Sequence, residues 1–195
     1  MLAVLFYLAC VGLTLTISLV GPILIGIAVG EQAVAMRFSV YLLLGGFLFG
    51  AVALAILHRQ RRMPRIGRLS LVALVWFILP IVAAIPIMDV SQLDLTDSLF
   101  ESVSGVTTTG SSVIQSVESW PVALIFWRVQ LQWLGGFLSI LTVVLFLAPL
   151  GIGGLTGRTR TLVANVDQSQ ALARMLFLTS RFALVYLLMT LLCFI

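Results

Sequence analysis

The stretch FESVSGVTTTGSS, residues 100–112, contains seven serine or threonine residues and two glycines. It lies within a chain of 195 residues of which 61% are hydrophobic and only 9% are charged. That composition is outside the range of soluble domains and indicates a polytopic membrane protein. The bilayer core offers no water to an unpaired backbone, so polar non-helical chain is tolerated there only when it is buried in protein or lines an aqueous path. The fold is therefore expected to be organised around this stretch.

Apolar segments on both sides of this stretch are long enough to span a bilayer. A hydrocarbon core of roughly 30 Å requires about 20 helical residues. Complete spans are predicted at 1–29, 38–57, 69–88 and from Trp120-Pro121 to about 147, and a further span begins at 172–195. The sequence therefore predicts an all-α membrane protein with two leading transmembrane helices, one helix, re-entrant loop and helix unit, and the first helix of a second unit.

Prolines and glycines interrupt or adjust these spans. Pro22 is expected to kink the first span or to mark its outer end, and Pro80 and Pro86 are expected to bend or end the third span near the outer face. Gly46 and Gly50 are one helical turn apart, so a neighbouring helix is expected to approach closely there.

The basic residues predict the orientation of the chain. All of them are arginines, and they concentrate in 58–68 and again at Arg158 and Arg160. Short arginine-rich loops are retained in the cytoplasm, which predicts a multi-pass protein of the cell (inner or plasma) membrane with a cytoplasmic amino terminus. Because orientation accounts for the positive charge, no nucleic-acid partner is expected.

Residues that would support an enzyme are scarce. The single histidine, His58, lies among arginines, and the spans contain neither an HExxH nor a GxSG pattern. Cys10 and Cys193 lie in apolar runs, where a thiol behaves as a small hydrophobic group, so neither a disulfide nor a metal site is expected. An intramembrane enzyme is therefore disfavoured, whereas a structural membrane subunit remains an alternative.

A half-length helix is predicted at 96–104, with Asp94 or Ser98 as its N-cap. It is too short to span the bilayer, so the chain must enter and return on the same side. Gly105 is predicted to end the helix, because glycine tolerates the left-handed conformation found at helix ends. If the helix enters from outside, the partial negative charge at its carboxyl end stabilises a cation near the membrane centre.

Acidic residues gather on the outer side and predict a cation-attracting entrance. Ordinary solvated loop residues and helix caps are the alternative, which is favoured for the first and last of the group. The residues are Asp89, Asp94, Asp97, Glu101 and Glu118.

The residues after the half-length helix have the chemistry of a selectivity filter. Thr107, Thr108 and Thr109 favour an extended backbone, and Gly110 permits the dihedral angles that turn a carbonyl group inward. Successive carbonyl oxygens can replace the hydration shell of a hard cation such as potassium. An inert scaffold has no need for such polar backbone, so 107–110 is predicted to be an ion-binding segment.

The span that follows contains Arg128, about two turns from its start. An arginine at this depth is expected to face protein and to pair with Glu101 or Asp97, although snorkelling to the outer interface is an alternative. In either case its role is expected to be anchoring of the filter. Gln130 is expected to be a polar packing group, and the glycines at 135–136 suggest a close approach or a kink.

The order and spacing of these motifs resemble the Trk/Ktr/HKT superfamily of potassium transporters, most closely its TrkH-type members. The resemblance covers essentially the whole chain and is strongest over 99–154. The residues that carry it are Phe100-Glu101, Ser104-Gly105, Thr107 to Gly110, Phe126-Trp127-Arg128 and Gln132 to Gly136.

This resemblance implies a channel-like potassium uptake protein in which four unequal repeats surround one pore. Residues 107–110 would form the first quarter of the filter, with the carbonyl groups of Thr108 and Thr109 nearest the potassium ion and with Glu101, Arg128 and Gly105 in support. Glycine at position 110 goes with potassium preference in the family, and serine goes with sodium permeation. No bound cofactor is implied. The implied partners are membrane lipid, the remaining pore repeats, a second transporter in a dimer and a cytosolic nucleotide-binding regulatory subunit.

The chain is expected to divide into 1–68 with the two leading helices, 69–154 with the first repeat, and 155–195 with the start of a second repeat. One quarter of a filter cannot enclose an ion, so the missing repeats are expected in a longer chain or a partner chain. A homotetramer would leave the surplus helices without an obvious place. The alternative is a non-conducting structural subunit or an inactive fragment of such a transporter.

Overall fold

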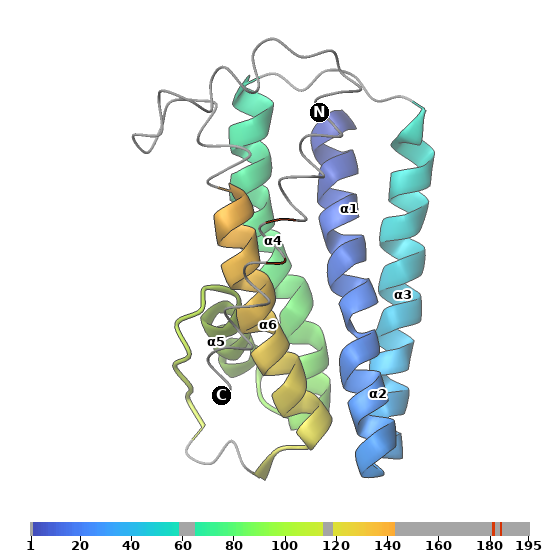
Figure 1. Cartoon of the computed structure of the whole chain (residues 1–195), viewed down its shortest axis with the longest axis vertical. Coiled ribbons are helices and arrows are strands. Elements are labelled where there is room, and N and C mark those ends of the chain that lie inside the picture. The colour runs from blue at the N-terminus through green and yellow to red at the C-terminus, as the bar shows by residue number, and fades with distance from the viewer. Residues whose placement is uncertain (1, 59–64, 115–118, 143–180, 182–183, 185–195) are drawn as a thin grey trace. The chain divides into compact units, whose positions relative to one another are not determined.

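The computed structural model describes residues 2–58, 65–114, 119–142, 181 and 184 (Figure 1). The chain forms two compact units, residues 1–136 and 137–195, and every contact given below lies within the first. The predicted features within 59–64, at Glu118 and beyond residue 142 lie outside the described residues, apart from positions 181 and 184. The helices are α1 (Leu2–Ser18), α2 (Val20–Val29), α3 (Gln32–Leu57), α4 (Arg65–Ser91), α5 (Leu95–Val106) and α6 (Val122–Leu141).

Within the described residues, four segments are long and apolar enough to cross a membrane. They are Leu2–Val29, Gln32–Leu57, Ile66–Ser91 and Val122–Leu141. The described part of the chain contains no strand. The prediction of an all-α polytopic membrane protein is therefore confirmed.

The first span consists of α1 and α2, and the break between them lies at Leu19. Pro22 explains the break, because it has no N–H to donate to the carbonyl oxygen of Ser18 four residues earlier. The backbone N–H of Leu19 instead donates to the carbonyl oxygen of Thr16 at 3.1 Å. The predicted kink at Pro22 is confirmed.

α2 ends at Gly30, whose φ of 88° is left-handed. The N–H of Gly30 donates to the carbonyl oxygen of Ile27 at 3.3 Å, and the N–H of Glu31 donates to that of Gly26 at 2.7 Å. These two bonds form a Schellman motif, which satisfies the last carbonyl groups of a helix. The motif also fixes the backbone of Glu31 as the chain turns into α3.

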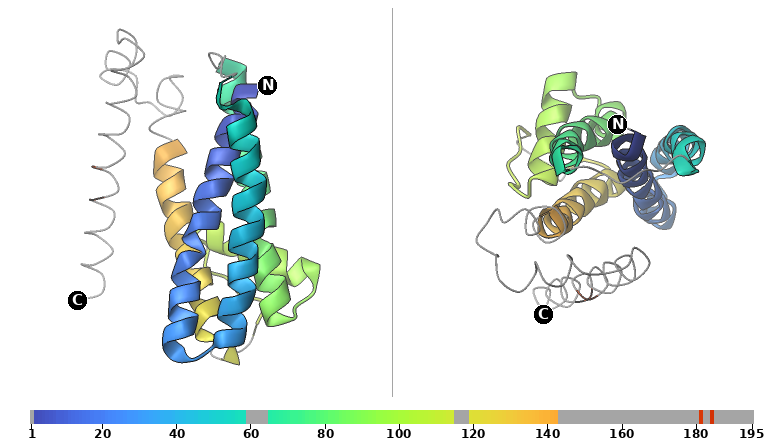
Figure 2. Two further views of the ribbon diagram at one scale, coloured as in Figure 1. Left: turned by 90° about the vertical axis from the view of Figure 1, so that its right-hand side faces the viewer. Right: turned by 90° about the horizontal axis from the view of Figure 1, so that it is seen from above.

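α1 lies between α3 and α4 and packs closely against both of them (Figures 1 and 2). Two glycines permit the approach of α1 to α3. A Cβ atom on Gly12 would lie 2.6 Å from the ring of Phe49, and one on Gly45 would lie 2.7 Å from the hydroxyl oxygen of Thr16. Small residues therefore bring these two helices together, as is usual inside membranes.

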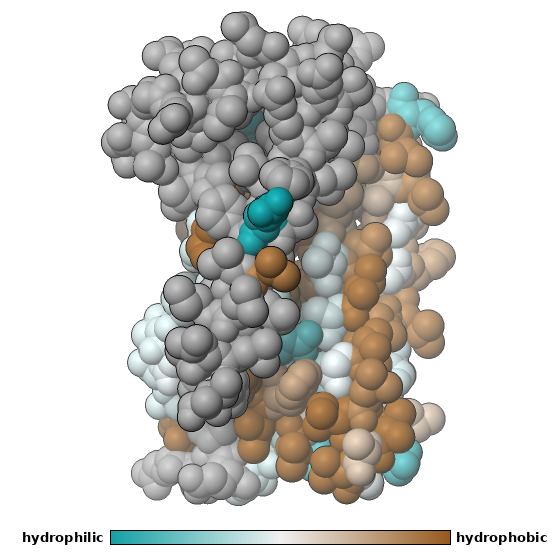
Figure 3. Space-filling view, viewed as in Figure 1, coloured by the Kyte–Doolittle hydropathy of each residue, from teal (hydrophilic) through white to brown (hydrophobic). Residues whose placement is uncertain are grey.

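The close approach predicted at Gly46 and Gly50 is wrong for the described part of the chain. A Cβ atom on either glycine would meet nothing within 4 Å among the described residues. Successive helical positions are about 100° apart, so a helix that packs against Gly45 leaves Gly46 on another face. Large apolar side chains such as Leu43 and Phe47 are exposed on α3, and Figure 3 shows hydrophobic residues over the right-hand side of this view.

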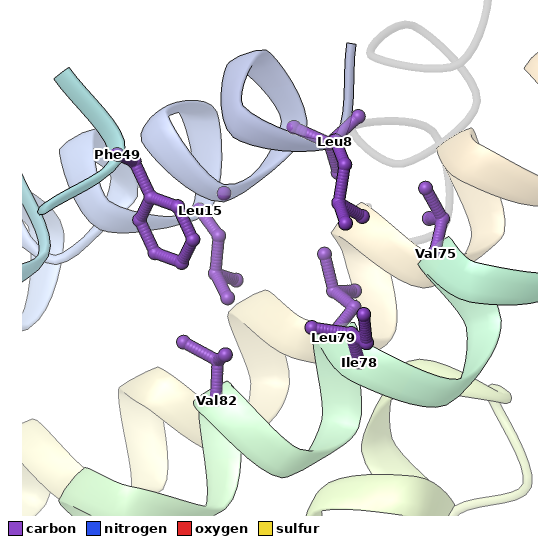
Figure 4. Close-up of a pocket in the computed structure, with 9 residues that line it drawn as sticks. Leu8, Leu15, Phe49, Val75, Ile78, Leu79 and Val82 are labelled. Atoms are coloured by element: carbon purple, nitrogen blue, oxygen red, sulfur yellow. The ribbon is translucent and has the colours of Figure 1, made fainter. Parts of the chain in front are cut away.

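The interior between α1, α3 and α4 is apolar. A void of about 50 Å³ lies among these three helices, and Figure 4 shows Leu15, Leu79 and Val82 among the side chains that line it. Its other lining residues are Leu8, Val11, Gly12, Phe49, Val75 and Ile78. Apolar cavities of this kind remain dry, and no polar side chain among the described residues lines this one.

Pro80 and Pro86 lie inside α4, and neither ends it. The expectation that they could end the span is therefore wrong, since the helix continues through both. Side chains of neighbouring helices donate to the backbone of α4 beside each proline. Ser102 Oγ donates to the carbonyl oxygen of Pro80 at 2.6 Å, and Trp127 Nε1 donates to that of Ala83 at 3.3 Å. These two bonds join α4 to α5 and α6, but the carbonyl groups that the prolines leave without a helical donor are those of Trp76 and Val82.

α3 begins six residues before the predicted span, at Gln32. Arg37, in its second turn, reaches the end of α4. Its Nη1 atom donates to the carbonyl oxygen of Asp89 at 2.8 Å and lies 3.4 Å from Oδ1 of the same residue. Because Arg37 is bound to Asp89, α3 can begin before its apolar segment without leaving the charge of Arg37 unpaired.

A candidate ion-binding loop between α4 and α6

α5 is a short helix whose polar face is buried. Its N-cap is Asp94, since the carboxylate of Asp94 accepts the N–H of Asp97 at 2.8 Å. Ser98, Glu101 and Ser102 are fully buried, whereas apolar side chains of α5 such as Phe100 and Val103 are exposed. A helix with its polar side towards protein and its apolar side outward is suited to a lipid surrounding. Of the two predicted caps, the structure selects Asp94.

The prediction that Gly105 ends this helix is wrong. α5 continues to Val106, and the first left-handed residue after it is Thr108, with a φ of 59°. Gly105 instead permits the approach of α6, because a Cβ atom at this position would lie 3.2 Å from the Cβ atom of Leu131. Gly110, with a φ of 76°, supplies the second left-handed turn.

The backbone N–H groups of the loop after α5 are directed back to the end of that helix. Thr107 donates to the carbonyl oxygen of Val103 at 2.8 Å and Thr108 to that of Gly105 at 3.0 Å. The next two N–H groups, at 109 and 110, both donate to the carbonyl oxygen of Ser104, at 3.0 and 3.3 Å. The carbonyl groups of Val103, Ser104 and Gly105 at the end of α5 are therefore satisfied by the loop itself.

The carbonyl oxygens of the same three threonines have no such partners. Within the described residues, no hydrogen bond reaches the carbonyl oxygen of Thr107, Thr108 or Thr109. These residues are exposed, and the hydroxyl groups of Thr107 and Thr109 share a hydrogen bond of 2.8 Å. The loop therefore carries a run of carbonyl oxygens that are available to an external partner.

A buried ion pair joins α5 to α6. Arg128 Nε donates to Glu101 Oε2 at 2.7 Å, and the two side chains are 12% and 0% exposed. The predicted pairing of Arg128 with an acid is confirmed, and Glu101 is the partner in preference to Asp97. Because its side chain is fully buried, Glu101 does not belong to the solvated acidic entrance that was predicted.

The same ion pair also binds residues 110–113, where the loop returns towards α6. Glu101 Oε1 accepts the hydroxyl of Ser112 at 2.6 Å and the N–H of Val113 at 2.9 Å. Arg128 Nη2 donates to the carbonyl oxygens of Gly110 at 3.3 Å and Ser111 at 2.9 Å. The carbonyl oxygen of Ser111 also accepts Ser104 Oγ at 2.6 Å. Residues 110–113 are therefore fixed by the pair and by α5, directly after the three threonine carbonyl groups.

α6 approaches the end of α5 very closely. A Cβ atom on Gly135 would collide with the backbone carbonyl group of Val106. The close approach predicted for 135–136 is therefore confirmed at Gly135. A Cβ atom on Gly110 would lie 3.6 Å from Gln132 Nε2, so α6 also borders the loop.

The opposite face of α6 is attached to α2. Gln130 Nε2 donates at 2.9 Å to the carbonyl oxygen of Ser18, the carbonyl that Pro22 leaves without a helical donor. The prediction that Gln130 is a polar packing group is confirmed. A Cβ atom on Gly21 would lie 2.7 Å from the ring of Phe126, so the two helices are in close contact.

Glu31 was not recognised from the sequence as part of this arrangement. Its Oε1 accepts the N–H of Val122 at 2.7 Å, and its Oε2 accepts the N–H of Ala123 at 3.0 Å. The residue stands 91 positions before Val122, and backbone donors carry no sequence signature. The only available signal was its place directly after a helix-ending glycine.

No cluster of three or more histidine, cysteine, aspartate or glutamate side chains occurs among the residues that the structure describes. In the loop after α5, the groups that could bind a cation are backbone carbonyl and threonine hydroxyl oxygens. Oxygen ligands of this type suit alkali cations, and they are found where a filter replaces water around an ion.

Spanning helices with a half-length helix and an oxygen-rich loop between α4 and α6 define a polytopic membrane protein. The TrkH family, described as cation transport proteins, matches residues 45–195, and the chain belongs to this family. No solved structure gives a significant match.

Several curated relatives are potassium uptake proteins. The chain is 32% identical over 145 residues to Trk system potassium uptake protein TrkH of Halomonas elongata, covering 72% of this chain and 29% of the relative. It is 34% identical over 125 residues to TrkH of Escherichia coli K12, covering 63% and 26%. The match to TrkG of Escherichia coli K12 is 43% identical over 86 residues, covering 43% and 18%. The chain thus spans less than a third of the length of these relatives.

Proposed function

We propose that this chain takes part in potassium uptake across the cell membrane and that residues 107–110 supply the first quarter of a selectivity filter. The observation that carries the proposal is the asymmetry of the loop backbone. Its N–H groups are bound to the end of α5, whereas the carbonyl oxygens of Thr107, Thr108 and Thr109 accept no hydrogen bond from the described residues. A loop whose N–H groups are bound within the protein and whose carbonyl oxygens accept no hydrogen bond from the described residues is suited to binding a cation.

The chemistry of the loop favours a weakly hydrated cation. Carbonyl oxygens can replace the water molecules around potassium at a modest cost, which permits both entry and release. The carbonyl end of α5 adds partial negative charge beside the loop. In this proposal the carbonyl groups of Thr108 and Thr109 lie nearest the ion, and potassium is the transported substrate rather than a resident cofactor.

Three residues support the filter without binding the ion. Arg128 fixes the carbonyl groups of Gly110 and Ser111, and Glu101 fixes the backbone at Val113. Gly105 allows α6 to lie close enough for these contacts. The positive charge of Arg128 is balanced by Glu101, so the pair can hold the loop without repelling a cation from it.

The rest of the transporter is part of the same proposal. Residues 1–68, 69–154 and 155–195 would be the leading helices, the first repeat and the start of the second repeat. The remaining repeats, from the same longer chain or from a partner chain, would complete the pore. The transporter would lie among the lipids of the inner or plasma membrane with its amino terminus in the cytoplasm, would form a dimer, and would bind a cytosolic nucleotide-binding subunit.

The proposal can be tested by joining the whole chain in frame to the part of Escherichia coli TrkH that lies beyond the matching region. The fusion should restore growth of a potassium-uptake-deficient strain at low potassium, whereas the chain alone should not. In the fusion, Gly110→Ser should lower the ratio of potassium to sodium uptake, because a side chain is strained at a φ of 76°. Gly46→Ser, at a glycine with open space around it, is the matched control.

The alternative is a non-conducting structural subunit. It predicts that a stably inserted fusion transports neither ion, or that Gly110→Ser and Gly46→Ser have equal uptake ratios. Growth rescue by the chain alone would instead indicate that it assembles a complete pore from its own copies.

A further inference from the structure

The first turn of α6 depends on a distant side chain for its hydrogen bonds. Pro121 has no N–H group, and the N–H groups of Leu124 and Ile125 both donate to the carbonyl oxygen of Pro121, at 2.9 and 3.1 Å. The other two N–H groups of this turn belong to Val122 and Ala123, and each donates to one carboxylate oxygen of Glu31. One side chain from the α2–α3 turn therefore completes the start of α6.

The geometry of Glu31 is set by its own backbone. Gly30 is left-handed, and the N–H of Glu31 is bound to the carbonyl oxygen of Gly26. A Cβ atom on Gly26 would lie 3.2 Å from Ala35 and 3.4 Å from Ala123, so the turn is packed against α6. The backbone of Glu31 is thus held in a fixed position, and its carboxylate lies at the positive end of the α6 dipole. An open depression of about 490 Å³ beside this contact gives the carboxylate access to water.

α6 connects this turn to the loop after α5. One face of α6 meets α2 at Phe126 and Gln130, and another face carries Arg128, which holds the carbonyl groups of Gly110 and Ser111. Arg128 lies six residues from Val122, which is about 9 Å along the helix axis. A change in the position of the helix start is therefore transmitted to Arg128 through less than two turns of helix.

We propose that Glu31 is a positioning residue for residues 107–113. It fixes the outer end of α6, and α6 in turn places the guanidinium group of Arg128 on the loop. The leading hairpin α1–α3 thereby sets the geometry of the loop rather than serving only as a membrane anchor. The consequence for ion selection rests on the proposed function, whereas the consequence for loop order does not.

The inference is tested first on the whole chain reconstituted in lipid nanodiscs, by hydrogen–deuterium exchange. Glu31→Ala removes both acceptors, and Glu31→Gln retains one oxygen but loses the charge. Both should speed exchange in 107–113 while leaving the core of α1 and α3 unchanged. Gln32→Ala is the matched control, because Gln32 is the exposed next residue. Equal exchange in 107–113 for Glu31→Ala and Gln32→Ala overturns the proposal, and so does faster exchange throughout the chain, which would mean that Glu31 only stabilises the fold.

A second measurement uses the fusion with Escherichia coli TrkH and compares ion uptake per folded molecule. The interaction of a carboxylate with a helix start corresponds to a factor of roughly two to five in an equilibrium, which is the largest change it can transmit to such a ratio. Glu31→Gln should lower the ratio of potassium to sodium uptake by up to a factor of this size, and Gln32→Ala should not. If the unaltered fusion transports no potassium, the proposed function fails while the exchange result stands. If it transports potassium and Glu31→Gln leaves the ratio unchanged, the role of Glu31 in ion selection is overturned.

Discussion

Removal of the arginine from the buried ion pair should destabilise the protein strongly. Arg128→Met would leave the carboxylate of Glu101, which is 0% exposed, with only the Ser112 hydroxyl and the Val113 N–H as partners. Removing one member of a buried pair costs about 3–5 kcal/mol, because the other charge is left uncompensated. We expect a loss of this size in the free energy of unfolding of the whole chain.

A second substitution should restore part of this loss. In Glu101→Gln with Arg128→Met both charges are gone, and the main remaining cost is the lost donor to the carbonyl oxygens of Gly110 and Ser111. Two such hydrogen bonds contribute roughly 2 kcal/mol. The double variant should therefore be more stable than Arg128→Met by roughly 1–3 kcal/mol.

The assay is unfolding of the purified chain in mixed micelles with increasing dodecyl sulfate, followed by circular dichroism. Arg37→Met is the control, because the Arg37–Asp89 pair is 47% and 36% exposed and such pairs contribute under about 1 kcal/mol. The reasoning would be refuted if Arg128→Met cost no more than Arg37→Met. It would also be refuted if the double variant were no more stable than Arg128→Met.

The same unfolding assay tests three other contacts. Gly135→Ala should cost about 1–3 kcal/mol, because its Cβ atom collides with a carbonyl group of α5, whereas Gly46→Ala should cost nothing; equal midpoints would contradict the close approach of α5 and α6. Asp94→Ala should cost about 1 kcal/mol through loss of the N-cap of α5, and no loss would mean that the cap is unimportant. Gln130→Glu should cost more than Gln130→Met, because a buried carboxylate would face the carbonyl oxygen of Ser18 without a proton to donate. The reverse order would show that another group holds that carbonyl.

Local features of the fold were predictable because their causes lie close together in the sequence. Long apolar segments specify spanning helices wherever they are placed. Pro22 breaks the first span because it cannot donate to a carbonyl group four residues earlier, and Asp94 caps α5 through an N–H three residues later. The pairing of Arg128 was also predictable, since a charge at that depth requires an opposite charge and few acids are available.

Predictions failed where a neighbouring helix decided the outcome. Gly105 has the conformational freedom to end α5, but it is used to bring Leu131 close. Pro80 and Pro86 have the chemistry to end α4, but the helix continues through both and is bonded to α5 and α6 at the carbonyl groups of Pro80 and Ala83. Gly46 and Gly50 have the spacing of a packing motif, but α1 lies on the adjacent face of α3. A residue type limits what a position can do, and the neighbour selects among the remaining options.

The candidate site shows the same division. The sequence by itself determined that residues 107–110 are a polar loop after a half-length helix, because composition and helix length depend only on neighbouring residues. Only the tertiary structure decided that the N–H groups of this loop are bound to α5 while three carbonyl groups have no donor among the described residues, and that Glu31 completes the start of α6. Backbone donors and acceptors are identical at almost every position of a chain. Their partners are therefore set by how the helices meet in space.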